Sequence, residues 1–174
     1  MKTGPTIRRF AVVLGLLLFS TMQADATEAT PIPPPVAATC ISSPFGPRFL
    51  ALHPAAGHFH DGIDLPAGLG APVRAVAPGR LIRVQRKGLG GLEMLVQHDG
   101  FIGVYSHLGL IAPAVLEGRR TFAAGQQIAT VGRSGMTSGP HMFFGMLVNG
   151  KPVDPAPYLQ LPPCGHEAPK TPTG

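Results

Sequence analysis

The sequence of 174 residues has no tryptophan, only two cysteines, and few charged residues, which make up 13% of the chain. Since 44% of the residues are hydrophobic, a chain kept disordered by its charge is excluded. There is no G-x-G-x-x-G after an expected strand, no P-loop and no C-x-x-C-H, so nothing indicates a nucleotide, a flavin or a haem. No long segment has a 3.6-residue hydrophobic period, and no internal repeat is present. The length fits one domain, with tails, that contains little helix.

The first 26 residues have the pattern of an export signal. Residues 10–19 are an apolar stretch of ten, which is too short to span a bilayer as a helix of about 20 residues. Three basic residues precede this stretch, and Ala24-Asp25-Ala26 follows it as a small-x-small cleavage pattern. We expect a signal peptide over residues 1–26, export to the periplasm or cell envelope, and no transmembrane span in the mature chain. A retained membrane anchor is the alternative.

Removal of this segment would take away three basic residues and one acidic residue, which lowers the formal net charge from +5 to +3. The remaining positive charge suits an anionic polymer such as a cell wall. The basic residues are scattered and form no stripe interleaved with aromatic residues, so no nucleic-acid partner is expected.

The cysteines and prolines mark the ends of the expected domain. Prolines cluster near both ends of the chain, which predicts an extended linker over residues 27–39 and a disordered tail over residues 165–174. Cys40 and Cys164 bracket the folded domain expected between them. In an oxidising compartment one disulfide between them is the simplest arrangement, with two free thiols as the alternative.

Glycines placed singly between short apolar runs predict an all-β domain, a small antiparallel β-barrel or sandwich with glycine-rich loops around a groove. The Asp99-Gly100 pair between two apolar runs is a strong signal for a β-hairpin. The expected strands are residues 73–76, 80–85, 92–98, 101–106, 126–131 and 141–148.

Histidines are concentrated in the middle of the chain, with six of the seven between His53 and His141. In His60-Asp61-Gly62-Ile63-Asp64 an imidazole and a carboxylate, both normal zinc donors, stand four residues apart. Such a pair alone is more often a solvated surface pair. Tyr105-Ser106-His107-Leu108 places a further histidine at the end of an apolar strand, and a polar, glycine-rich loop leads into His141.

The order of five motifs resembles the LytM/lysostaphin-type (M23) peptidase family over about residues 43–159. The motifs are Ser43-Pro44-Phe45-Gly46-Pro47-Arg48, His60-Asp61-Gly62-Ile63-Asp64, Gly70-Ala71-Pro72-Val73, Tyr105-Ser106-His107-Leu108 and Thr137-Ser138-Gly139-Pro140-His141. The resemblance implies a zinc endopeptidase that cuts peptide cross-links in peptidoglycan. It also implies that His60 and Asp64 bind zinc and that His107 and His141 assist catalysis.

The family pattern is broken at its third zinc ligand, the second histidine of H-x-H, where this chain has Phe143. Because side chains alternate along a strand, Phe143 is expected to point to the same side as His141, into the site. Phenylalanine has no lone pair, so we expect zinc to bind weakly or not at all. Gly145 stands where the family often has an acid, so a further polar group is missing from this face of the strand. His58 is a less suitable replacement ligand, because it would approach the metal from the wrong side.

Four polar residues of the loop before His141 are expected to donate hydrogen bonds to carbonyls or carboxylates of the substrate: Arg133, Ser134, Thr137 and Ser138. With residues 86–92, the loop 133–140 is expected to wall the groove. His98 is expected to be structural, Met142 to lie in the core, and His53 and His166 to be solvated.

Two functions therefore compete. The favoured one is a catalytically degenerate domain that binds cell-wall peptide, or regulates a partner cell-wall hydrolase. The alternative is an active zinc metalloendopeptidase with a different third ligand. An unrelated carbohydrate- or lipid-binding role is the third possibility considered.

Overall fold

The computed structural model describes residues 30–48 and 58–165. The expected signal peptide over residues 1–26, His53 and His166 lie outside the described residues, as does nearly all of the expected tail. The strands are β1 (Gly46–Pro47), β2 (Phe59–His60), β3 (Ile63–Pro66), β4 (Pro72–Arg74), β5 (Gly79–Lys87), β6 (Gly91–His98), β7 (Ile102–Ser106), β8 (Leu108–Ile111), β9 (Thr121–Phe122), β10 (Gln127–Val131), β11 (His141–Val148) and β12 (Lys151–Val153).

The described part of the chain is nearly all β, as the sequence predicts. One turn of 3-10 helix, η2 (Gly88–Gly90), joins β5 to β6, and α1 (Pro113–Leu116) and α2 (Ala156–Leu159) have four residues each. No helix among the described residues is long and apolar enough to cross a membrane.

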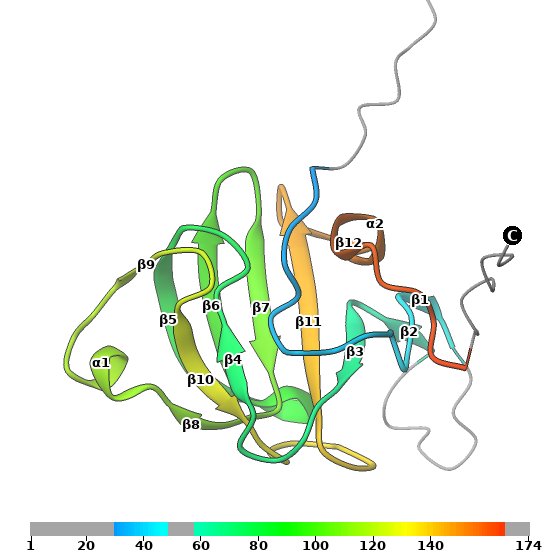
Figure 1. Cartoon of the computed structure of the whole chain (residues 1–174), viewed down its shortest axis with the longest axis horizontal. Helices are drawn as coiled ribbons and strands as arrows, with labels where there is room; N and C mark the ends of the chain where they lie inside the picture. Colours follow the sequence, from blue (N-terminus) through cyan, green and yellow to red (C-terminus); the bar gives the residue numbers. More distant parts are fainter. Residues whose placement is uncertain (1–29, 49–57, 166–174) are drawn as a thin grey trace, which may run out of the picture.

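A curved antiparallel sheet in the strand order β12-β11-β7-β6-β5-β9, with β3 also paired to β11, forms the larger layer. A smaller sheet in the order β4-β10-β8 lies over it, in front of β5 and β6 in the view of Figure 1. The predicted hairpin at Asp99-Gly100 connects β6 to β7. The fold is therefore a curled half-barrel of antiparallel strands.

Alternation along the central strands separates a core face from an open face. Met94 of β6, Tyr105 of β7, and Met142 and Phe144 of β11 are fully buried in one cluster with residues of the smaller sheet. Full burial of such side chains contributes about 1.5–3 kcal/mol each. The expected place of Met142 in the core is confirmed, and the residues between these positions are left to line the other face of the sheet.

His98 is structural, as expected. It is 3% exposed, and its Nδ1 lies 3.0 Å from the Pro78 carbonyl oxygen. Its Nε2 lies 3.1 Å from the Tyr105 hydroxyl, which also accepts a hydrogen bond from the Val76 amide. Both ring nitrogens are thus occupied inside the domain.

The two ends of the domain are joined, which confirms the predicted disulfide between Cys40 and Cys164. Beside it, the Ile41 amide donates to the Pro162 carbonyl at 2.8 Å, and the Cys164 amide donates to the Ile41 carbonyl at 2.8 Å. The preceding segment packs on the domain too, since Val36 is buried and the Pro35 carbonyl accepts a bond from the Arg74 amide. The domain boundary at residue 40 stays a prediction.

Candidate functional site

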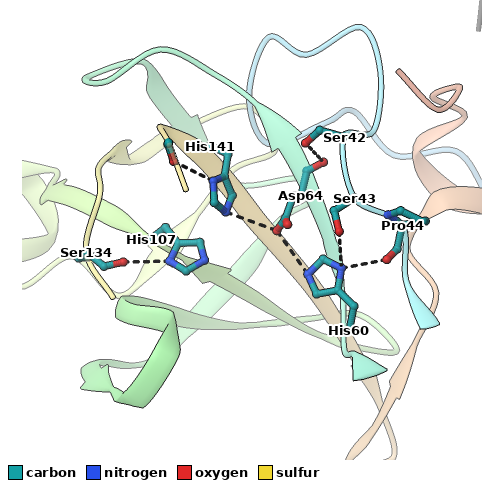
Figure 2. A network of polar contacts seen from close by, with 9 residues as sticks. Ser42, Ser43, Pro44, His60, Asp64, His107, Ser134 and His141 are labelled. Carbon is teal, nitrogen blue, oxygen red and sulfur yellow. Dashed lines mark hydrogen bonds and ion pairs between the residues drawn. The ribbon is translucent and has the colours of Figure 1, made fainter. Parts of the chain in front are cut away.

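Three of the four residues expected at the zinc-type site meet at one carboxylate oxygen, and the fourth, His107, lies beside them. Asp64 lies on β3, His60 ends β2, and His141 begins β11. His60 Nε2 lies 3.3 Å and His141 Nε2 lies 3.6 Å from Asp64 Oδ1, as Figure 2 shows. Asp64 Oδ1 is buried and has no hydrogen-bond donor in the described part of the chain beyond these two contacts.

The segment that carries the first motif holds His60 and Asp64 in place. The Pro44 carbonyl lies 2.9 Å from His60 Nδ1. The Asp64 amide donates to the Ser43 carbonyl at 2.9 Å, and the Asp64 carbonyl accepts from the Ser42 amide at 2.9 Å. Residues 42–44 therefore clamp the backbone of β3 and fix the ring of His60.

The remaining two histidines are oriented in the same way. His141 Nδ1 lies 2.9 Å from the Gly139 carbonyl, and His107 Nδ1 lies 2.9 Å from the Ser134 carbonyl. A carbonyl oxygen only accepts hydrogen bonds, so Nδ1 carries the proton in all three rings. Each ring thereby has a fixed tautomer, the arrangement that backbone carbonyls give to metal-binding histidines.

His107 completes the cluster from the opposite wall. Its ring centroid lies 4.7 Å from that of His141. Its φ of 61° is in the left-handed region, which residues other than glycine seldom adopt. Its amide donates to the Gly90 carbonyl, and its carbonyl accepts from the Gly132 amide, so both glycine-rich loops are fastened to it. Backbone strain held by its surroundings is common at functional sites.

The charges of the cluster act on one another. Burial raises the pKa of Asp64, but the hydrogen bond from His60 and the favourable electrostatic interaction with the three imidazoles in their protonated forms outweigh it, so the pKa is lowered below 3.8. Burial lowers the pKa of His107, and the nearby charge of His141 lowers it further, against the opposing effects of the Ser134 carbonyl and Asp64. Asp64 is therefore ionised at neutral pH and His107 is neutral.

Phe143 lies on the same side of β11 as His141, and both residues line a groove on the open face of the sheet. Its ring centroid lies 5.4 Å from that of His60 and 6.3 Å from that of His107. A Cβ atom added to Gly62 would lie 2.6 Å from Phe143 Cζ, and one added to Gly145 would lie 3.2 Å from Cε1. Gly62 and Gly145 have no side chains, and the Phe143 ring occupies the space that this leaves open.

These residues do not fit the zinc site that the family resemblance implies. Zinc in such a site needs three protein ligands with nitrogen or oxygen atoms about 2.0–2.2 Å from the metal, and Phe143 offers no such atom. No three His, Cys, Asp or Glu side chains within residues 30–48 and 58–165 are arranged to hold a metal ion. His58, the other ligand considered, is exposed. Weak or absent zinc binding stays a prediction.

The cluster can be stable without a metal. Asp64 accepts hydrogen bonds and cannot donate one when ionised, so at least one facing Nε2 atom needs a proton or a bound cation. The Pro44 carbonyl faces Nδ1 of His60 and the Gly139 carbonyl faces Nδ1 of His141, so the Nε2 atom of either ring is the one that faces Asp64.

A groove of about 540 Å³ extends from this cluster across the open face of β5, β6, β7 and β11. One wall is formed by Lys87 and the residues of η2, which include Leu89, and another by Met136 and Ser138. Both loops that were expected to wall the groove therefore contribute. The remaining lining residues are mostly the outward-facing side chains of the four strands, among them Arg83, Gln85, Glu93, Leu95, Val104, Ser106, Gly145 and Leu147.

Of the four loop residues expected to bind substrate, only Ser138 lines the groove. Ser134 is engaged within the protein, because its hydroxyl donates to the Leu108 carbonyl at 2.8 Å and accepts from the Leu92 amide at 2.9 Å. Arg133 is exposed and Thr137 is partly exposed. Substrate contacts of these residues remain predictions, and the visible role of Ser134 is to hold His107.

The structure also adds residues to the groove that the sequence analysis did not single out, above all Glu93. This acid is 8% exposed and stands in the apolar run Leu92-Glu93-Met94-Leu95-Val96. A single acid inside an apolar strand is a sequence signal by which it could have been found.

Comparisons with known proteins identify the family of this chain. Residues 58–155 match Peptidase family M23. The chain is 39% identical over 124 residues to the DD-carboxypeptidase/endopeptidase Mpg of Neisseria meningitidis serogroup B. This match covers 70% of this chain and 27% of that protein. It is 32% identical over 117 residues to the peptidoglycan DD-endopeptidase ShyB of Vibrio cholerae, covering 66% and 26% respectively. The chain thus spans little more than a quarter of either relative.

The fold is similar to that of the catalytic domain of the antimicrobial peptidase lysostaphin from Staphylococcus simulans, with a TM-score of 0.60 and 28% identity. That likeness covers 69% of this chain and 91% of the lysostaphin domain. The family match extends over more than half of the chain, and it includes His60, Asp64, His107 and His141. The chain belongs to peptidase family M23.

Proposed function

We propose that this protein is an exported M23 domain that binds cell-wall peptide without hydrolysing it, and that it acts as a binding module or as a regulator of a partner cell-wall hydrolase. The observation that carries the proposal is the position of Phe143, whose ring lies beside His60 where the H-x-H pattern requires a zinc ligand. Without a third ligand the site would not hold zinc firmly enough to activate a water molecule.

The groove is retained although the ligand is lost, which supports a binding role. Substrate binding uses the walls and floor of a groove, and these do not depend on the metal. The floor combines apolar residues such as Leu95, Val104 and Leu147 with polar groups at both ends. Such a surface suits an extended peptide with alternating apolar and polar contacts.

The class of ligand follows from the relatives. ShyB is named as a peptidoglycan DD-endopeptidase, and Mpg as a DD-carboxypeptidase/endopeptidase. A domain of the same family would bind the peptide part of peptidoglycan and would therefore act in the periplasm or cell envelope. The expected signal peptide is consistent with this location.

The alternative is an active zinc metalloendopeptidase, and one observation favours it. His60, Asp64, His107 and His141 all remain, and the three histidines have the same fixed tautomer. If zinc bound here, it would supply an activated water, and this chain's His107 would be placed to accept a proton at Nε2.

Co-sedimentation with purified peptidoglycan tests the proposal, together with an assay for soluble fragments with zinc present. The mature protein should sediment with the polymer and release no fragments. Leu147→Asp, which puts a charge on the groove floor, should weaken binding by at least about tenfold. Leu110→Asp is the matched control, because Leu110 is 74% exposed on β8 and does not line the groove.

Two other results would contradict the proposal, each in a different way. Release of soluble fragments by the wild-type protein, lost in His107→Ala, would establish the active alternative. Failure of the wild-type protein to sediment, or equal binding by the two leucine variants, would overturn binding through this groove.

A further inference from the structure

A second polar group, centred on Glu93, lies in the groove apart from the histidine cluster. Glu93 on β6 is 8% exposed and lines the groove. Its Oε2 accepts a hydrogen bond from the Ser106 hydroxyl at 3.1 Å, and its Oε1 accepts one from the Gln85 side-chain amide. Three neighbouring strands, β5, β6 and β7, therefore contribute to one carboxylate site.

The fold fixes the position of this carboxylate relative to the histidine cluster. Gln85 and Glu93 are paired between β5 and β6, Ser106 and Phe143 are paired between β7 and β11, and Phe143 and Asp64 are paired between β11 and β3. Strands in a sheet lie about 4.8 Å apart, so three strand spacings separate Glu93 from Asp64 by roughly 14 Å. An extended peptide of about four residues bridges that distance.

The loop above the carboxylate approaches it closely. A Cβ atom added to Gly90 would lie 3.0 Å from Glu93 Oε2 and 3.3 Å from Ser106 Oγ. Glycine at this position in η2 lets the loop close over the acid and reduces its contact with water. The carboxylate is thus built into the groove, not left on the surface.

The charge of Glu93 is not balanced within the described part of the chain. The ion pairs among these residues both involve Asp64. Glu93 has only neutral donors, Gln85 and Ser106. A buried carboxylate is costly unless it is hydrogen-bonded and paired, and two donors leave lone pairs on both oxygens unused. A cation is the kind of partner that such a carboxylate can accept.

Nearby basic residues are not that partner. Arg83 and Lys87 line the same groove, but both are exposed and neither forms an ion pair with Glu93. They lie on the groove side of β5 and are open to solvent, where they suit carboxylates of a ligand. The groove therefore presents an anionic point under η2 beside a cationic edge on β5.

We propose that Glu93, positioned by Gln85 and Ser106, is the recognition site for a primary ammonium group of the peptide bound in the groove. An ammonium has three donors, and it can bind both carboxylate oxygens and a lone pair of the Ser106 hydroxyl at once. The amine belongs to the side chain of a diamino acid residue of the peptide. This inference rests on the proposed function, because it assumes that a peptide occupies the groove.

Calorimetric titration of the mature protein with two synthetic peptides tests the inference. The peptides follow a cell-wall stem sequence and are identical except that the side-chain amine of the diamino acid is free in one and acetylated in the other. Acetylation should weaken binding to the wild-type protein at least about tenfold. Glu93→Gln should bind the free amine about as weakly as the wild-type protein binds the acetylated peptide, and acetylation should make little difference to it.

Asp99→Asn is the matched control. Asp99 is an exposed acid in the β6–β7 turn, so its replacement removes the same charge without touching the groove, and asparagine also suits the turn. This variant should retain the full preference for the free amine. If it loses the preference, overall charge and not Glu93 selects the amine, and the inference is wrong.

The comparison within the wild-type protein keeps the inference falsifiable even if Glu93→Gln does not fold. Equal affinity of the wild-type protein for both peptides would overturn the ammonium site and leave peptide binding intact. Absence of binding to either peptide would overturn the proposed function, and the ammonium site with it.

Discussion

Phe143 and Asp64 are direct partners in the antiparallel ladder between β11 and β3. A carboxylate that contacts two imidazoles therefore stands beside a phenyl ring that also lies 5.4 Å from the ring of His60. The register that would bring a third ligand to the metal brings an apolar ring instead.

Phe143→His should raise the affinity for zinc by more than about 100-fold. Changes in residues that only support a metal ligand alter metal affinity about 10–100-fold, and a restored ligand should do more. Zinc titration followed by calorimetry measures the effect. Phe143→Asn, which is polar but a poor zinc ligand, is the control, and an equal gain in both variants would contradict the explanation.

Gly62→Ala should lower the free energy of unfolding by about 1–3 kcal/mol, as overpacking usually does. The added Cβ would lie 2.5 Å from the Phe144 carbonyl oxygen and 2.6 Å from Phe143 Cζ. Urea denaturation measures the loss. Gly68→Ala is the control, because a Cβ there would meet no atom within 4 Å. Equal stability of the two variants would show that the ring does not pack against Gly62.

The long strands could be predicted because their patterns are local. The expected strand at residues 141–148 matches β11, and those at residues 80–85 and 92–98 fall within β5 and β6. β3 was missed since its four residues include Asp64 and Pro66, and polar residues and proline weaken a strand pattern. β8 was missed as well, because it is short and its pairing with β10 depends on contacts distant in sequence.

His98 should make the protein less stable as the pH falls. Burial lowers the pKa of this imidazole below its ordinary value of 6.5, so between the two pKa values the unfolded chain binds a proton that the folded chain does not. The unfolding free energy should thus fall as the pH decreases below about 6.5, by up to about 1.4 kcal/mol per pH unit for this group. Urea denaturation at pH 7.5 and pH 5.5 measures it.

His98→Asn should reduce this pH dependence, although part of it should remain because burial also lowers the pKa of His107. His58→Asn is the control, since His58 is exposed, and it should behave as the wild-type protein does. A reversed slope in the wild-type protein would contradict the prediction.

Replacement of both cysteines, Cys40→Ser with Cys164→Ser, should lower the free energy of unfolding by about 2–5 kcal/mol. The disulfide joins residues 124 positions apart, so it strongly restricts the unfolded chain. Thermal unfolding with and without a reductant measures the effect. The reductant should destabilise the wild-type protein and leave the double variant unchanged; a reductant effect of equal size in both would point to another cause.

The candidate site could be predicted only in part, for a physical reason. Motif spacing identified His60, Asp64, His107 and His141, and the structure brings these four together. The role of Ser134 could not be foreseen, because its bonds to Leu108 and Leu92 depend on how two distant loops pack. Glu93 has a sequence signal, a single acid inside an apolar strand, but its hydrogen-bond donors lie on neighbouring strands and could not be read from the sequence.

The zinc content of the purified mature protein tests the central claim most directly. After exposure to excess zinc and removal of unbound metal, elemental analysis should find well below one zinc per chain, because Phe143 leaves the site short of a ligand. One zinc per chain, lost in Asp64→Ala, would contradict the claim and would favour an active peptidase.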